Sequence, residues 1–182
     1  MNHCYFFLSA ILIGLFFQAC NHSTAQNQKE LIHDPTIFPF DLTLQDADGK
    51  QYRSSEVFKK NGKPTVLFFW LTTCKPCHMK LSAIAPLYPN WIKEADFNTY
   101  AISGDLPRNH QKFAQQTKSK NWQWETYLDV DRKFRELLPG NLNGYPQTFI
   151  FDEDGKLVYQ DKRYRPGDEH RLFAKIKSIT NG

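Results

Sequence analysis

The stretch that decides the fold of this chain is FFWLTTCKPCHMK, residues 68–80. It continues an apolar run that starts at Thr65, and such a β-branched and aromatic run is typical of a strand buried on both faces of a sheet. Cys74 and Cys77 follow, spaced C-x-x-C with Pro76 between them. This spacing leaves four interpretations open: a redox pair, a haem attachment site, a metal site or an inert bridge.

The position of Cys74 between a strand and a helix favours the redox interpretation. The free N–H groups and the dipole at a helix start both stabilise a thiolate, and Lys75 adds a cation. Pro76 suits the first helical turn, where a missing N–H costs nothing. A bridge that encloses only two residues removes little chain entropy, which disfavours an inert staple. We predict Cys74 as the nucleophile and Cys77 as the resolving thiol.

The remaining pattern predicts an α/β fold. From residue 38 onward the order of elements is β-β-α-β-α-β-α-β-α-β-β-α, which indicates a mixed sheet with helices on both faces. Asp48-Gly49 and Asp154-Gly155 are the expected turns of two hairpins. Pro86 and Pro89 are expected to kink or split the helix behind the cysteines.

Residues 38–180 resemble exported proteins of the TlpA/ResA type within the thioredoxin superfamily. The resemblance rests on C-x-P-C after a buried strand, on AISGD (101–105) and on GYPQTFIFDEDGKLVY (144–159). It implies a thioredoxin-like three-layer fold, in which helices flank a central mixed sheet and a β-hairpin extends the N-terminus. It also implies a thiol–disulfide oxidoreductase with no dissociable cofactor, whose redox group is the Cys74–Cys77 disulfide.

The resemblance also gives supporting roles to residues outside the cysteine motif. In the family the proline that matches Pro146 is cis and packs against the disulfide, whereas the frequency of cis X-Pro bonds alone favours trans. Carried over, Tyr145 and Pro146 face Cys74, and Tyr145 offers its backbone to an extended substrate segment. Trp70 is expected either to pack beneath the site or to be an ordinary core residue.

Three positions depart from the family pattern. Phe68 stands where thioredoxins carry a buried Asp, and Thr73 stands where a Trp is frequent. Lys80 replaces the Glu of ResA-like members, one helical turn past Cys77. We hypothesise that this cation lowers the cysteine pKa and makes the pair more oxidising. The alternative is a lysine that faces solvent.

The N-terminus indicates export. CYFFLSAILIGLFF (4–17) is shorter than the roughly 18–20 residues that span a bilayer, and it resembles the core of an export signal. It ends before Cys20 in FFQAC, which resembles the lipobox of bacterial lipoproteins. We predict a lipoprotein signal over 1–19, lipidation of Cys20 within a flexible tether over 20–37, and a thioredoxin-like domain over 38–182. A soluble secreted form and an uncleaved anchor are the alternatives.

These features together predict a lipid-anchored enzyme of the bacterial cell envelope that faces the periplasm, on either the inner or the outer membrane. We expect a monomer that reduces disulfides of client proteins, as in cytochrome c maturation or related thiol reduction, with electrons from a membrane dithiol carrier. The net charge of +4 is spread along the chain without a basic block, so no nucleic-acid partner is expected.

Rival functions use the same residues. His78 completes C-x-x-C-H, the attachment pattern of c-type haem. A copper or zinc carrier would use Cys74, Cys77 and His78, but no fourth ligand is obvious, so we predict no metal site. A peroxiredoxin-like peroxidase would carry Thr at position 71, where this chain has Leu71. A non-catalytic binding module is the last alternative.

Overall fold

The computed structural model describes residues 38–181. The predicted export signal, the tether up to residue 37 and the lipidation of Cys20 lie outside the described residues and stay predictions. Within residues 38–181, no helix combines the length and the apolar character that crossing a membrane requires.

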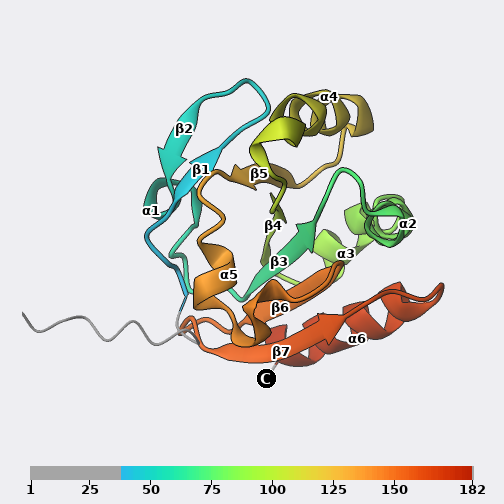
Figure 1. Cartoon of the computed structure of the whole chain (residues 1–182). Coiled ribbons are helices and arrows are strands. Elements are labelled where there is room, and N and C mark those ends of the chain that lie inside the picture. Colours follow the sequence, from blue (N-terminus) through green and yellow to red (C-terminus); the bar gives the residue numbers. More distant parts are fainter. Residues whose placement is uncertain (1–37, 182) are drawn as a thin grey trace, which may run out of the picture. The chain divides into compact units, whose positions relative to one another are not determined.

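Seven strands of the described part form one mixed sheet in the order β2-β1-β5-β4-β3-β6-β7 (Figure 1). The strands are β1 Thr43–Gln45, β2 Gln51–Arg53, β3 Thr65–Trp70, β4 Asn98–Ser103, β5 Glu125–Asp129, β6 Gln147–Phe151 and β7 Leu157–Lys162. β3, β4 and β5 run parallel, whereas β6 runs antiparallel to both β3 and β7. Every residue of β3 is buried, as its apolar sequence predicts for a central strand.

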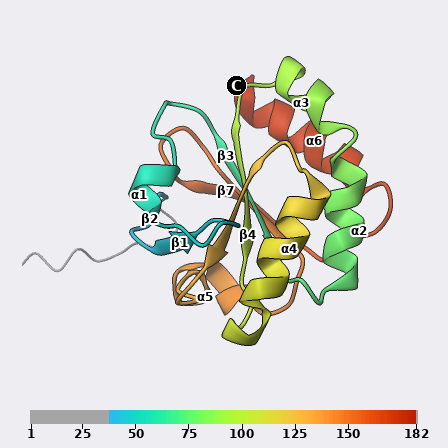
Figure 2. The same cartoon turned by 90° about the horizontal axis from the view of Figure 1, so that it is seen from above.

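Helices cover both faces of this sheet. They are α1 Ser54–Val57, α2 Lys75–Ile84, α3 Tyr88–Glu94, α4 His110–Lys120, α5 Phe134–Leu137 and α6 Asp168–Thr180, with the short 3₁₀ turns η1 Pro107–Asn109 and η2 Pro139–Leu142. Figure 2 shows α2, α3, α4 and α6 on one side of the sheet, and α1 and α5 on the other. The predicted three-layer α/β fold is therefore confirmed.

The local predictions that shape this fold are also confirmed. The helix behind the cysteines is split: α2 ends at Ile84 and α3 begins at Tyr88, on either side of Pro86. β1 and β2 form the N-terminal hairpin, and β1 pairs antiparallel with β5, so that the hairpin extends the sheet at one edge. β6 and β7 form the second predicted hairpin.

Two separate cores result from the alternation of side chains along β3. Val66, Phe68 and Trp70 enter one cluster, whereas Leu67 and Phe69 enter the other. The first, which we call the cysteine-side cluster, also contains Cys77, Leu81, Ile84, Trp91, Phe113, Trp124, Leu172 and Ile176. The second, the phenylalanine-side cluster, also contains Phe38, Phe40, Phe58, Tyr100, Phe134, Phe149 and Phe151.

Candidate active site

The two cysteines lie where β3 ends and α2 begins. Cys74 is the N-cap of α2 with an extended backbone, and its sulfur accepts a hydrogen bond from the Cys77 N–H at 3.2 Å. The two residues form a disulfide with their Cα atoms 5.3 Å apart. Cys77 is fully buried, whereas Cys74 is partly exposed. Because only Cys74 of the two cysteines is partly exposed, this arrangement suits the predicted order of attack.

The two residues between the cysteines leave the start of α2 exposed to solvent. Lys75 and Pro76 occupy the first helical positions and both are exposed. Within residues 38–181, Lys75 forms no ion pair. Its charge therefore adds to the positive end of the helix dipole beside Cys74.

Trp70 belongs to the core and also supports the site. Its side chain is fully buried in the cysteine-side cluster, against which Cys74 packs. The indole lies edge-on to the ring of His78, with 5.7 Å between the ring centroids, and to Trp122 at 5.2 Å. The two alternatives stated for Trp70 are thus one arrangement, since the residue is a core side chain directly under the start of α2.

A buried carboxylate that the sequence analysis did not single out holds the loop before Cys74. Asp105 is only 1% exposed, and it accepts hydrogen bonds from the backbone N–H of Thr72 at 2.8 Å and from the Thr72 hydroxyl at 2.9 Å. The Ser103 hydroxyl donates to the same carboxylate at 2.7 Å. The signal in the sequence was an acid directly after a buried strand, in AISGD. Asp105 fixes the chain two residues before the nucleophile.

The carbonyl oxygen of Thr72 ties the same loop to two helices. His78 Nε2 lies 3.1 Å from it, and Gln116 Nε2 donates to it at 3.4 Å. Since a carbonyl oxygen only accepts, His78 carries its proton on Nε2 here. The haem alternative needs this ring free as an axial ligand, and in the structure the ring is engaged with the backbone.

The loop of Tyr145 and Pro146 lies at the same end of the strands as the disulfide. The peptide bond between the two residues is cis, as the resemblance implies. β6 begins immediately afterwards, and its Gln147 pairs with Phe69 near the end of β3. Tyr145 and Cys74 pack against the same cluster. Within the described part of the chain, the backbone N–H and carbonyl of Tyr145 form no hydrogen bond, so both are open to another segment.

The ring of Tyr145 is positioned by a glycine. A Cβ on Gly104 would overlap the Tyr145 hydroxyl, so only glycine leaves room for this ring. The Gly104 N–H donates to the Trp70 carbonyl at 3.1 Å, which joins the ends of β3 and β4. Burial raises the pKa of Tyr145 above its ordinary value.

Lys80 lies on the buried side of α2 with Cys77, and the solvent-facing alternative is wrong. Its side chain is 2% exposed, and its ammonium lies 3.5 Å from a carboxylate oxygen of Asp161 on β7. Burial lowers the pKa of Lys80, and the Asp161 carboxylate opposes this shift. The cation is therefore paired, which weakens any effect that it has alone on the cysteine pair. The hypothesis that it makes the pair more oxidising stays a proposal.

Comparison with known proteins decides the family. The sequence pattern of the AhpC/TSA family matches residues 37–160. The chain belongs to the AhpC/TSA family. A solved structure of an uncharacterized thioredoxin-like protein from Porphyromonas gingivalis is 30% identical, with a TM-score of 0.65 over 78% of this chain and 91% of that one. The thioredoxin-like fold is thereby confirmed.

Two relatives that match this chain carry names of different kinds. Thiol-disulfide oxidoreductase ResA of Geobacillus thermodenitrificans is 28% identical over 117 residues, which are 64% of this chain and 63% of the relative. Peroxiredoxin Q of Gentiana triflora is 32% identical over 132 residues, 68% of this chain and 58% of the relative. This chain thus spans less than two thirds of the length of each of these two relatives.

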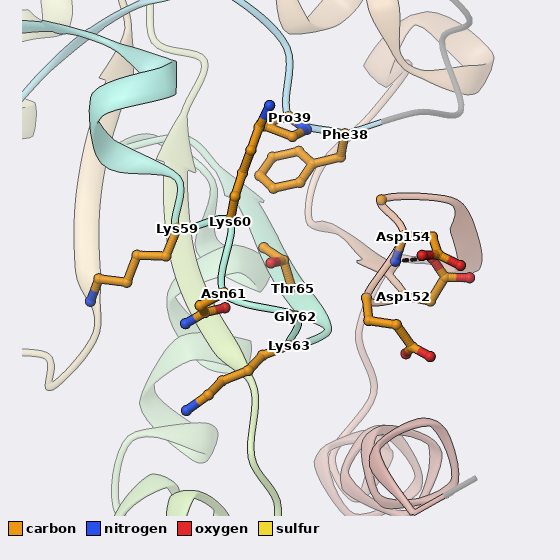
Figure 3. Close-up of a pocket in the computed structure, with 12 residues that line it drawn as sticks. Phe38, Pro39, Lys59, Lys60, Asn61, Gly62, Lys63, Thr65, Asp152 and Asp154 are labelled. Carbon is orange, nitrogen blue, oxygen red and sulfur yellow. Dashed lines mark hydrogen bonds between the residues drawn. The ribbon is translucent and has the colours of Figure 1, made fainter.

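One pocket of the described residues lies at the end of the sheet away from the disulfide. Figure 3 shows a pocket of about 400 Å³ at the start of β3, between the loop 59–63 and the turn 152–154. Two lysines that line this pocket form ion pairs with acids outside it: Lys59 pairs with Glu125, and Lys63 pairs with Asp96. This pocket lies at the opposite end of β3 from the disulfide. Within residues 38–181, no group of three or more His, Cys, Asp or Glu side chains is placed to hold a metal.

Proposed function

We propose that this chain is a thiol–disulfide oxidoreductase that exchanges disulfides with client proteins. The observation that carries the proposal is the Cys74–Cys77 bond at the start of α2, with one cysteine partly exposed and the other buried. The names of the ResA relatives support it. The cis Tyr145–Pro146 loop with its open backbone supports it further, because an extended client segment can pair there.

In the reducing direction the chemistry balances without a dissociable cofactor. The Cys74 thiolate attacks one sulfur of a client disulfide, the client bond breaks, and the departing sulfur takes a proton. Cys77 then loses its proton and attacks the Cys74 sulfur of the mixed disulfide. The client leaves as a dithiol and the Cys74–Cys77 bond forms. Two electrons pass to the client, and a dithiol donor must restore the pair.

The direction and location are part of the proposal. We infer a reductant in the bacterial cell envelope, a monomer anchored through lipid on Cys20 and recharged by a membrane dithiol carrier. The apolar run before Cys20 supports this placement. Labelling of cells with an alkyne-tagged fatty acid tests the anchor: the full chain should incorporate the label and Cys20→Ala should not. Equal labelling of both would contradict the anchor.

The exchange reaction is tested with insulin as the client and dithiothreitol as the electron donor. The wild-type chain should accelerate precipitation of the insulin B chain, and Cys74→Ser should leave only the uncatalysed rate. Reduced Cys77→Ser mixed with insulin without dithiothreitol should instead accumulate a mixed disulfide on Cys74, visible in a non-reducing gel and absent from the Cys74→Ser/Cys77→Ser double variant. A wild-type rate equal to that of Cys74→Ser would contradict the proposal.

A peroxidase is the second candidate, favoured by the AhpC/TSA family and by the peroxiredoxin Q relatives. There Cys74 would attack a peroxide, release an alcohol or water and become a sulfenic acid. Cys77 would then condense with it to the same disulfide and release water. Stopped-flow mixing of the reduced chain with hydrogen peroxide separates the two functions. The oxidoreductase proposal expects Cys74 to react no faster than a free thiolate, whereas a peroxidase would be faster by orders of magnitude.

A further inference from the structure

A second pocket opens beside the cis proline, at the end of the sheet where the disulfide lies. Its volume is about 280 Å³. It is lined by Asn143, Gly144, Tyr145, Pro146, Lys162 and Arg163. One wall is thus the loop that precedes β6, and the other is the end of β7.

The basic wall of this pocket is fixed to the proline loop by the backbone. The Arg163 N–H donates to the Pro146 carbonyl at 2.9 Å, and Lys162 pairs with Gln147 in the sheet. The backbone of Arg163 has φ 73°, a left-handed conformation that residues other than glycine rarely adopt. Such a conformation persists where the surroundings impose it, and it clusters at functional sites. The backbone of both residues is therefore held beside the proline.

The charge of this wall is not compensated. Lys162 and Arg163 are exposed, and within residues 38–181 their side chains form no ion pair or hydrogen bond. The acid next to them on the strand, Asp161, pairs with Lys80. The Lys162 ammonium lies against Gly140, where a Cβ would meet it. Two uncompensated basic residues therefore line the pocket and give it a positive potential.

The open backbone of Tyr145 indicates what enters. A client segment that pairs with this backbone would hold its cysteine over Cys74 and direct a neighbouring side chain into the pocket. We propose that the pocket is a client-recognition subsite for an acidic side chain, Asp or Glu, next to the cysteine that is reduced. Lys162 and Arg163 are its specificity-determining residues. This inference rests on the proposed oxidoreductase function.

The test compares two cystine peptides that differ in one residue. Both have the same sequence, with Glu in one and the isosteric Gln in the other beside the cysteine. The reduced full chain should reduce the Glu peptide with about three- to tenfold higher kcat/KM, the range of a partly exposed charge-assisted contact. Raising the salt concentration from low to about 1 M should remove most of this preference, because it screens exposed charges.

Matched variants locate the preference. Lys162→Gln/Arg163→Gln should reduce both peptides at the rate at which the wild type reduces the Gln peptide. Lys60→Gln/Lys156→Gln removes the same charge at the opposite end of the sheet, where both lysines are exposed and unpaired among the described residues, and it should keep the full preference.

The outcomes separate this inference from the proposed function. Equal wild-type rates for the two peptides, or a preference that survives in Lys162→Gln/Arg163→Gln, would overturn the subsite while leaving the oxidoreductase intact. Failure to reduce either peptide would overturn the proposed function and the subsite together. An unchanged rate for the Gln peptide in the double variant shows that the variant is folded and that its cysteine pair is intact.

Discussion

Both faces of the sheet bury aromatic rings, but only one of them also holds the cysteine pair. The phenylalanine-side cluster is built from aromatic rings in edge-to-face contact, such as Phe58 with Tyr100 at 5.0 Å and Phe69 with Phe134 at 5.0 Å. The opposite face buries Cys77 and Lys80 among its apolar side chains. Polar burial weakens a core unless each group is paired. We infer that the phenylalanine-side cluster contributes to stability at a distance from the cysteine pair, whereas the cysteine-side cluster also positions that pair.

The largest effect is expected in the phenylalanine-side cluster. Phe58 is 2% exposed and contacts the rings of Phe38, Tyr100 and Phe134. Phe58→Ala should lower the free energy of unfolding by about 3–5 kcal/mol, measured by urea denaturation. Val158→Ala, at a surface position, should change it by no more than about 0.5 kcal/mol. Below the unfolding transition, Phe58→Ala should leave the alkylation rate of reduced Cys74 unchanged. A changed rate would show that the phenylalanine-side cluster also affects the cysteine pair.

The buried carboxyl of Asp129, at the end of β5, should make the free energy of unfolding depend on pH. Burial raises the pKa of Asp129 from 3.8 to about 6, although the backbone N–H groups of Phe134 and Lys133 donate to it. The folded pKa exceeds the unfolded one, so this contribution is fully present below pH 3.8 and is lost as the pH rises through 6. The loss amounts to about 3 kcal/mol.

Chemical denaturation between pH 4 and pH 7.5 measures this loss. The free energy of unfolding of the wild type should fall with rising pH relative to that of Asp129→Asn, whose side chain does not titrate. Parallel pH profiles of the two proteins would show that the pKa of Asp129 is not raised by folding and that Asp129 does not make stability depend on pH.

The hydrogen-bond network before Cys74 should have an intermediate effect. In Asp105→Asn a single carbonyl oxygen replaces the carboxylate that accepts from both donors of Thr72 and from Ser103, so donors are left unpaired. The expected loss of unfolding free energy is about 2–3 kcal/mol. Asp96→Asn, at an exposed pair with Lys63, should cost less than about 1 kcal/mol. Similar losses in both variants would mean that the network does not stabilise the loop.

The smallest effect is expected from the ion pair beneath the site. Lys80→Met should raise the pKa of the Cys74 thiol and Asp161→Asn should lower it, each by less than about one unit, since the two charges oppose each other. Thiolate absorbance against pH measures both. Shifts of the same sign would show that the variants act through packing and would end the electrostatic hypothesis for Lys80.

The sequence was sufficient wherever neighbouring residues decide the structure. The strand before Cys74, the turn at Asp48-Gly49 and the break at Pro86 depend on side chains within a few positions, and each is confirmed. The resemblance supplied the cis bond before Pro146, which local preference alone would have made trans.

The missed features depend on contacts between distant positions. The partner of Lys80 lies 81 residues away, and the sequence gives no sign of which acid will reach it. Asp105 and Thr72 meet because β3 and β4 end side by side, 33 residues apart. The uncompensated charges of Lys162 and Arg163 could not be told from solvated surface charges until the proline loop was placed against them.

The most direct test of the whole account is the pKa of the Cys74 thiol. It is measured from the pH dependence of iodoacetamide alkylation in the full chain with Cys4, Cys20 and Cys77 replaced by Ser, folded and then unfolded in guanidinium chloride. The account predicts a folded pKa clearly below the value of about 8.5 expected for the unfolded chain, because the start of α2 stabilises the thiolate. A folded pKa equal to or above the unfolded one would contradict it.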